Sequence, residues 1–198
     1  MKYAKRDIVI PHEKREEYNK RCLAVVEGEN KSLTPEDVAA FYTGIGGLHG
    51  LSASDFGDYS SYSTAKKQYE HGQFFTDYNL AQWVVDCVQP NEDDIVADLT
   101  CGHGSFFNCL PNEKRLIGIE LEENAWKVAK FLYPDAQIRH ADIMEWVPSE
   151  AADIVIGNPP FGLRWIMRGE EMKSEYCYCV RAADVLVPGG ILAVIVPH

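Results

Sequence analysis

The stretch IVADLTCGHGSFF, residues 95–107, decides the fold because it joins a short apolar run to a glycine-rich turn. Residues 95–99 have the composition of a buried strand, and an acid, Asp98, stands near the end of that run. Gly102 and Gly104 follow, and glycine lets a backbone approach a ligand closely with its amides unobstructed. The stretch therefore predicts a strand that ends at a ligand-binding loop.

Around this stretch, short β-rich runs alternate with helical segments. Runs that are apolar throughout and separated by helices indicate a parallel sheet covered on both faces. The predicted fold class is therefore α/β, a Rossmann-like doubly wound sheet. The expected strands are 95–99, 115–121, 136–140, 153–157 and 190–197, and the expected helices are 80–88, 122–132 and 173–186.

The N-terminal part of the chain has a different pattern. Residues 12–27 have helical spacing, and a second helix is expected to begin after Thr34, a good N-cap followed by proline. Residues 43–63 are rich in Gly, Ser and Tyr, so we expect an ordered loop there. We therefore divide the chain into a helical and loop extension, residues 1–70, and a core domain, residues 71–198.

Composition places the chain among ordinary globular proteins, with 46% hydrophobic and 25% charged residues in a length of 198. The basic N-terminus has no apolar stretch behind it, and the longest apolar run covers only residues 191–196. We therefore expect no signal peptide, no membrane span and a cytoplasmic location. The six cysteines form no C-x2-C pair, so we expect reduced thiols and neither a metal site nor disulfides.

Two further acids follow the next strands. Glu120 ends the second strand, 120 − 98 = 22 residues after Asp98, where a carboxylate can accept hydrogen bonds from both hydroxyls of a ribose. Asp142 follows the third strand, where it could receive the exocyclic amine of an adenine. Phe107 occupies the third glycine position of a dinucleotide fingerprint, so the pattern favours S-adenosylmethionine over NAD.

The fourth strand runs into an unusual loop, DIVIGNPPFG, residues 153–162. The loop holds no titratable general base after Gly157. Pro159 holds Asn158 extended, and Pro160 has no amide to pair with the Pro159 carbonyl. An Asn side-chain oxygen and a carbonyl can together accept both hydrogens of a planar amine, while Phe161 offers a face for a ring. The loop predicts methyl transfer to a conjugated amine; the plainer alternative is a tight turn after a buried strand.

These motifs resemble those of the N6-adenine DNA methyltransferases of restriction-modification systems and mobile elements. DIVIGNPPF resembles the catalytic motif of amino-group methyltransferases, and HGQFFTDYNLAQWVV (71–85) resembles the segment before the family's first motif. DLTCGHGSF, IGIELEENAWKVA, ADI and PGGILAVIVP follow in the family's order. The resemblance covers roughly residues 71–197.

The resemblance implies S-adenosylmethionine as cofactor and a flipped-out adenine of DNA as substrate. Asp77 departs from the family, which usually has proline there, but it can still cap the following helix. The residues implied at the target adenine are Asn158, Pro159, Pro160 and Phe161, and those implied at the cofactor are Phe75, Thr76, Asp98, Cys101, Gly102, Gly104, Glu120, Leu121, Asp142, Ile143 and Asn158.

A second departure concerns size and charge. The family's sheet has seven strands, whereas five are expected here, and no segment has room for a target-recognition domain. The net charge of −11 also opposes binding of DNA by phosphate neutralisation alone. We expect DNA contacts to come from a local patch, from further C-terminal sequence or from a partner subunit.

Alternatives to DNA adenine methylation stay open at this point. Asn-Pro-Pro-aromatic loops also serve methyltransferases that act on RNA guanine amines or on protein glutamine, although the GQFFT segment favours DNA. A non-catalytic cofactor-binding module of a larger assembly is the alternative from another class. Zinc deaminases, which also flip bases, are excluded because the sequence has no H-x-E and P-C-x-x-C pattern.

Overall fold

A computed structural model describes residues 2–3, 8, 10–44, 53–69 and 75–197. The chain divides into two compact units, one formed by Thr76–His198 with Met1–Lys2 and the other by Tyr3–Phe75. The domain boundary predicted between residues 70 and 71 lies outside the described residues. No helix in the described ranges combines the length and apolar character needed to cross a bilayer.

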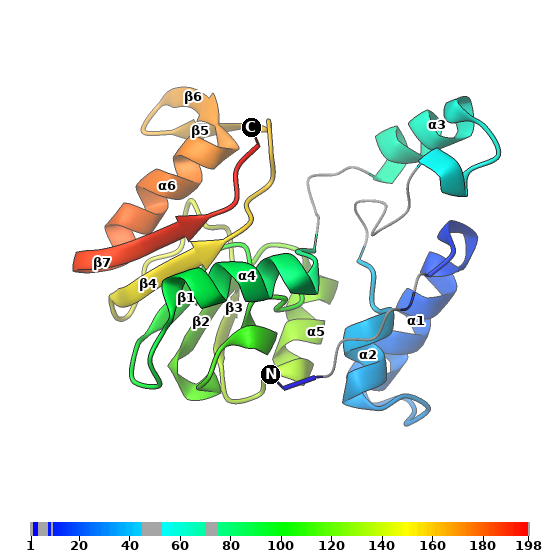
Figure 1. The fold of residues 1–198 in the computed structure, drawn as a ribbon, viewed down its shortest axis with the longest axis horizontal. Coiled ribbons are helices and arrows are strands. Elements are labelled where there is room, and N and C mark those ends of the chain that lie inside the picture. The colour runs from blue at the N-terminus through cyan, green and yellow to red at the C-terminus, as the bar shows by residue number, and fades with distance from the viewer. Residues whose placement is uncertain (1, 4–7, 9, 45–52, 70–74, 198) are drawn as a thin grey trace. The chain divides into compact units, whose positions relative to one another are not determined.

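The larger unit is built on a five-stranded parallel sheet of order β3-β2-β1-β4-β7 (Figure 1). Its mixed α/β architecture confirms the predicted fold class. The strands are β1 (Val96–Asp98), β2 (Leu116–Glu120), β3 (Gln137–His140), β4 (Ala152–Gly157) and β7 (Leu186–Val194).

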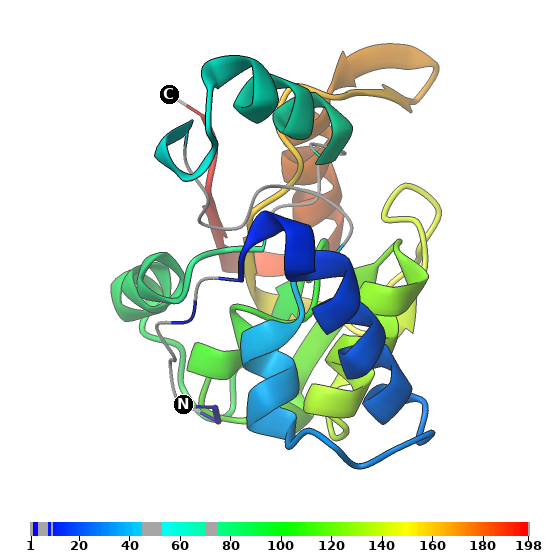
Figure 2. The ribbon, with the colours of Figure 1, turned by 90° about the vertical axis from the view of Figure 1, so that its right-hand side faces the viewer.

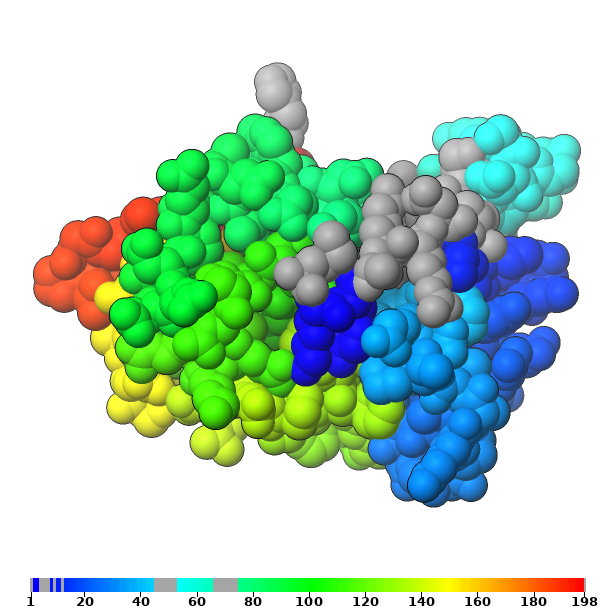
Figure 3. All heavy atoms as spheres, turned by 60° about the horizontal axis from the view of Figure 1, so that its bottom comes forward, coloured from blue at the N-terminus to red at the C-terminus, as the bar shows by residue number. Residues whose placement is uncertain are grey.

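The helices of this unit agree with the expected segments. They are α4 (Tyr78–Val88), α5 (Glu123–Leu132) and α6 (Ser174–Val185). Asp77 caps α4 as expected, because its Oδ1 accepts a hydrogen bond of 2.9 Å from the Asn79 amide. Figure 3 shows α4, in green, at the surface of this unit, where Trp83 is exposed while Val84 and Val85 are buried. The helix is thus amphipathic and buries one side against the sheet unit.

One hairpin in the larger unit was not expected. Strands β5 (Arg164–Met167) and β6 (Glu170–Lys173) form an antiparallel pair. In the sequence, the pair lies between the loop that contains Asn158 and helix α6. Figures 1 and 2 show this hairpin at the amino-terminal end of α6. The hairpin therefore follows the end of β4, next to the residues predicted to do chemistry.

The smaller unit contains α1 (Arg15–Val26), α2 (Pro35–Phe41) and α3 (Tyr59–Tyr69). Thr34 caps α2 as predicted, in a reciprocal capping box with Asp37. The expectation of a loop over 43–63 is wrong from residue 59 onward, because α3 begins at Tyr59, and residues 45–52 lie outside the described ranges. Asp58 begins this helix by accepting a bond of 2.7 Å from the Ser61 amide.

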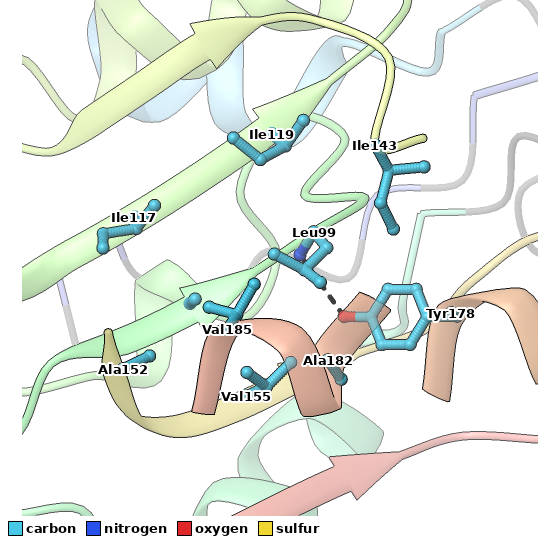
Figure 4. Close-up of a cluster of buried hydrophobic side chains, with 10 residues drawn as sticks. Leu99, Ile117, Ile119, Ile143, Ala152, Val155, Tyr178, Ala182 and Val185 are labelled. Carbon is cyan, nitrogen blue, oxygen red and sulfur yellow. Dashed lines mark hydrogen bonds between the residues drawn. The ribbon is translucent and has the colours of Figure 1, made fainter. Parts of the chain in front are cut away.

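The core beneath α6 joins the sheet to the helix through one buried tyrosine. Figure 4 shows Tyr178 among apolar residues of β1, β2 and α6, with its hydroxyl toward Leu99. The hydroxyl donates to the Ile156 carbonyl at 2.9 Å and accepts from the Leu99 amide at 3.3 Å. Gly157 is required nearby, because a Cβ there would lie 2.0 Å from the same hydroxyl oxygen. Tyr178 thus connects the carboxyl ends of β1 and β4.

Replacing Tyr178 with phenylalanine should lower the free energy of unfolding by about 1–3 kcal/mol, because a buried amide and a buried carbonyl lose their shared partner. Tyr176, which is 64% exposed on the same helix, provides a matched control, and Tyr176→Phe should change stability by less than about 0.5 kcal/mol. Urea unfolding of both variants measures the difference. Equal effects would show that the buried hydroxyl is not a stabilising link.

Candidate functional site

The predicted site residues lie along one edge of the parallel sheet. Asp98 and Glu120 end β1 and β2, Asp142 follows β3, and Asn158 follows β4. These four strands are neighbours in the order β3-β2-β1-β4, and all are parallel, so their carboxyl ends share one edge. Ligands of open α/β sheets bind at that edge, where the strand order reverses, here between β1 and β4.

The glycine-rich loop after β1 folds over the end of β2. The Gly102 amide donates to Glu120 Oε2 at 2.8 Å, and the Cys101 amide donates to the Ile119 carbonyl at 2.9 Å. Gly102 has a φ of 57°, a conformation that favours glycine. The structure therefore brings Cys101, Gly102 and Glu120 together, although they are separated in sequence.

The end of β2 is also joined to the end of β3. The second carboxylate oxygen of Glu120 accepts a hydrogen bond of 2.8 Å from the Glu122 amide. The backbone carbonyl of Glu120 accepts a hydrogen bond of 3.0 Å from the Ala141 amide. Leu121 is 66% exposed beside these groups. Glu120 and Leu121 thus stand at the sheet edge, the first fixed by hydrogen bonds and the second presenting an apolar surface.

Asp142 and Ile143 occupy different environments despite being adjacent. Asp142 is half-buried, and its Oδ1 accepts a bond of 2.8 Å from the Met144 amide. The Ile143 side chain is buried in the core near Tyr178 (Figure 4). The Asp142 carboxylate therefore lies at the sheet edge, whereas the Ile143 side chain packs in the interior.

Two buried acids give the site a negative character. Burial raises the pKa of Asp98 to about 7, the Thr100 amide opposes the shift, and the nearby Glu120 adds to it. Burial likewise raises the pKa of Glu120, against the amides of Glu122 and Gly102. No lysine or arginine of the described ranges forms an ion pair with either acid. Two buried acids without a cationic partner suit a ligand that carries positive charge together with hydroxyl groups.

Gly104 has a packing role as well as a place in the loop. Its φ is 93°, and a Cβ there would lie 2.4 Å from a ring carbon of Tyr133. Phe107, at the third glycine position of a dinucleotide fingerprint, is buried against the same ring at a centroid distance of 5.6 Å. Gly104 is therefore required by the close approach of Tyr133, whatever the loop binds.

A Gly104→Ala substitution should lower the melting temperature, because it adds a backbone strain of about 1–3 kcal/mol and a steric clash. Gly169→Ala is the matched control, since Gly169 has a φ of 84° but open space around its Cβ position. Differential scanning calorimetry should show a larger loss for residue 104. A smaller loss there than at residue 169 would contradict the packing role of Tyr133.

The loop after β4 contains two acceptors that receive no hydrogen bond from the described residues. Asn158 Oδ1 is removed from water and accepts no hydrogen bond, and no described residue donates to the Pro159 carbonyl. By contrast, the Pro160 carbonyl accepts a bond of 2.6 Å from the Ser174 hydroxyl. A buried acceptor without a donor costs about 1–3 kcal/mol, so a ligand that donates to it would relieve that cost. The arrangement suits a ligand with two hydrogens on one nitrogen.

The first residues of α6 hold this loop in place, and sequence reasoning missed them. Glu175 Oε1 accepts a bond of 2.9 Å from the Gly162 amide, and the Ser174 hydroxyl lies 3.2 Å from the other carboxylate oxygen. Burial acts to raise the pKa of Glu175, but hydrogen bonds from its own amide, from Gly162 and from Ser174 lower it overall. Phe161 remains 37% exposed, with its ring available for contact. The position of Ser174 and Glu175 at the start of a predicted helix was the only local signal.

The two remaining predicted residues fall on either side of the division between the units. Phe75 belongs to the smaller unit, where its ring lies 5.8 Å from that of Tyr42. Thr76 begins the larger unit and is half-buried. Their contact with the cofactor therefore stays a prediction. Within the described residues, no group of three or more His, Cys, Asp or Glu side chains could hold a metal ion.

Comparison with known families and relatives gives matches that cover most of the chain. The family model described as N-6 DNA Methylase matches residues 59–198. A type II methyltransferase, M.CvrRI of Paramecium bursaria Chlorella virus XZ-6E, is 27% identical over 67% of this chain and 38% of its own length. A trans-aconitate 2-methyltransferase of Escherichia coli O157:H7 is 32% identical over 52% of this chain and 39% of its own length. The chain thus spans about two fifths of these relatives.

Solved structures agree on the fold. A class I S-adenosylmethionine-dependent methyltransferase from Listeria monocytogenes, described as putative, has a TM-score of 0.55 at 16% identity, covering 91% of this chain and 64% of its own. The methyltransferase subunit of a type I restriction-modification system from Streptococcus thermophilus has a TM-score of 0.53 at 18% identity, covering 82% and 42%.

Proposed function

The chain belongs to the N-6 DNA methylase family, and from this premise we propose that it transfers a methyl group from S-adenosylmethionine to the N6 amino group of adenine in DNA. The class I fold and the family membership confirm the predicted cofactor, S-adenosylmethionine. We propose, on the same basis, the activity of the whole protein, its DNA substrate and its partners.

The observation that carries the proposal is the pair of acceptors without donors, Asn158 Oδ1 and the Pro159 carbonyl. An exocyclic amine conjugated to a purine has two hydrogens and a delocalised lone pair. Two acceptors that take both hydrogens draw the lone pair out of the ring, where it becomes nucleophilic. The loop offers acceptors, so it does not suit an ionised carboxylic acid, which has no hydrogen to donate.

The bound cofactor would supply an electrophilic methyl group on a positively charged sulfur. In our proposal, Glu120 would accept hydrogen bonds from its ribose hydroxyls, and Asp98 would stabilise its positive charge at the end of β1. Leu121 and Asp142 would contact its adenine, with Asp142 accepting from the exocyclic amine. Each of these residues acts by binding and orientation, because the chemistry needs alignment of two reactive atoms more than acid or base catalysis.

At the target, Asn158 and Pro159 hold the amine of an adenine that has been flipped out of the duplex, and Phe161 contacts the ring. The bound cofactor would supply the methyl group to N6, and N6 would release its extra proton to water. No titratable group follows Gly157 in this loop to take that proton. Ser174 and Glu175 act as positioning residues by holding the carbonyl and amide of the same loop.

We further propose that the chain acts in a restriction-modification setting, together with a partner polypeptide that adds DNA contacts. The similar chain from Streptococcus thermophilus is a subunit of such a system, which supports this setting. The net charge of −11 is a second reason to expect additional DNA contacts from elsewhere.

Calorimetric titration with S-adenosylmethionine, followed by transfer of a labelled methyl group to DNA, RNA and protein, tests the proposal. We expect saturable cofactor binding and label in DNA, with little transfer by Asn158→Ala. Cofactor binding without transfer to DNA would favour RNA guanine or protein glutamine as substrate, according to where label is found. Cofactor binding without transfer to any substrate would instead identify a non-catalytic cofactor-binding module, and absence of cofactor binding would contradict the proposed activity.

A further inference from the structure

The β5–β6 hairpin presents two cations side by side on its exposed face. Arg164 and Lys173 are directly opposite partners in the antiparallel pair, and both side chains are exposed. Cross-strand partners point to the same face of a sheet, and like charges placed opposite each other are destabilising. The pair is therefore unfavourable for the hairpin by itself.

Neither cation forms an ion pair within the described part of the chain, although the charge of Lys173 helps to lower the pKa of Glu175. By contrast, Arg168, at the turn of the same hairpin, pairs with Asp184 at 3.8 Å. Lys173 is also the N-cap residue of α6, where a positive charge meets the positive end of the helix dipole. Two unfavourable placements at one point favour a negatively charged ligand that neutralises both.

The pair adjoins the loop that we propose holds the target adenine. Arg164 is the second residue after Gly162, and Lys173 directly precedes Ser174, which is bonded to the Pro160 carbonyl. The other face of the hairpin is fixed, because Met167 is 5% exposed and Trp165 packs against the hydrophobic core. Figures 1 and 2 show the hairpin at the amino-terminal end of α6. The cations are thus held on an anchored hairpin beside the loop.

We propose that Arg164 and Lys173 bind the DNA backbone phosphates that flank the flipped adenine, an inference that rests on the proposed function and deepens it. Phosphate contacts fix the register of a protein on DNA without reading the sequence. Three exposed apolar side chains within three residues of Arg164 offer contact to unstacked bases: Phe161, Leu163 and Ile166. Local cations of this kind are needed in a chain whose net charge is −11.

The test uses fluorescence anisotropy to measure the affinity for labelled duplex DNA between about 50 and 200 mM salt, with S-adenosylhomocysteine present to prevent turnover. Each of Arg164→Gln and Lys173→Gln should reduce the slope of log K against log salt by about 0.9, and the double variant by about twice that amount. Lys130→Gln removes an exposed cation from the last turn of α5 and should leave the slope unchanged.

A melting-temperature measurement separates binding from a structural role. The double variant should melt at the wild-type temperature or above it, because a like-charge pair has been removed. A lower melting temperature, an unchanged salt slope, or a wild-type chain that binds no DNA would overturn the inference. Methyl transfer by the wild-type chain is measured in parallel: transfer to DNA with an unchanged slope in the variants overturns only the phosphate contacts, whereas absence of transfer to DNA overturns the proposed function.

Discussion

Substitution of Asn158 by alanine should reduce kcat for methyl transfer by about 10²–10³-fold, the usual effect of removing one preorganised hydrogen-bonding group that stabilises a transition state. The Asn158 side-chain oxygen is buried and without a donor, so its removal should not lower the melting temperature. Single-turnover methylation with saturating cofactor measures the chemical step directly.

Asn158→Asp is the matched control, because it keeps the size of the side chain and its acceptor oxygens. It should retain more activity than the alanine variant. Asn158 was also predicted to contact the cofactor, and the calorimetric Kd for S-adenosylmethionine tests that role. A Kd that rises in proportion to the loss of kcat/KM would mean that Asn158 serves cofactor binding and not the target amine.

Asp98→Asn should stabilise the protein without cofactor and weaken cofactor binding at the same time. Burial raises the pKa of Asp98 from 3.8 to about 7, so the folded state binds the proton more tightly than the unfolded chain. Its contribution to stability is therefore full below pH 3.8 and is lost as the pH rises toward 7. At about pH 8 the charged side chain costs up to about 4 kcal/mol, which the asparagine variant avoids.

The same substitution should raise the Kd for S-adenosylmethionine by at least about 30-fold, because the positively charged cofactor loses a buried carboxylate. Wild-type affinity should itself fall by about tenfold from pH 8 to pH 6 as Asp98 takes up a proton, whereas the variant should show a flat profile. Asp135→Asn, at an exposed acid, is the control for the loss of one charge.

Thermal unfolding without cofactor and calorimetric titration, each over this pH range, provide the two measurements. If Asp98→Asn destabilises the protein at alkaline pH, then the charged Asp98 side chain does not lower the free energy of unfolding in the absence of cofactor. If it binds the cofactor as well as the wild type does, then Asp98 lies outside the binding site.

The central strands β1, β2 and β4 were predictable because they are buried almost throughout and form short apolar runs. Strand β7 differs most from its prediction, since it begins at Leu186 where the sequence suggested residue 190. Pro188 and Gly189 are unfavourable inside a strand, so the sequence did not predict that the strand extends back to residue 186. The structure accommodates them at the edge of the sheet, where the register against β4 shifts between Ala152 and Ile154.

Helix α3 and the β5–β6 hairpin had no comparable signal. The α3 sequence YSSYSTAKKQY has few apolar residues and several Ser and Tyr residues, which are modest helix formers. The hairpin sequence RWIMRGEEMK mixes charged and apolar residues, and its period-2 pattern covers only four residues in each strand. Local patterns this short do not separate a hairpin from a loop.

The positions of the strand-end acids and of the Asn-Pro-Pro-Phe loop were predictable, because both belong to local patterns, whereas their roles stay predictions. The supporting contacts of the site were not predictable. The bond between the Leu99 amide and the Tyr178 hydroxyl joins residues 79 apart in sequence, and the bond from Ser174 to the Pro160 carbonyl depends on the path of the hairpin between them. Such contacts depend on tertiary packing, which no local sequence pattern records.

The identity of the methylated nucleoside tests the central claim most directly. Duplex DNA is incubated with the protein and S-adenosylmethionine carrying an isotope-labelled methyl group, then digested and analysed by mass spectrometry. The account predicts that the label is recovered as N6-methyladenine and that Asn158→Ala removes it. Label found in another nucleoside, or in RNA or protein but not in DNA, would contradict the account.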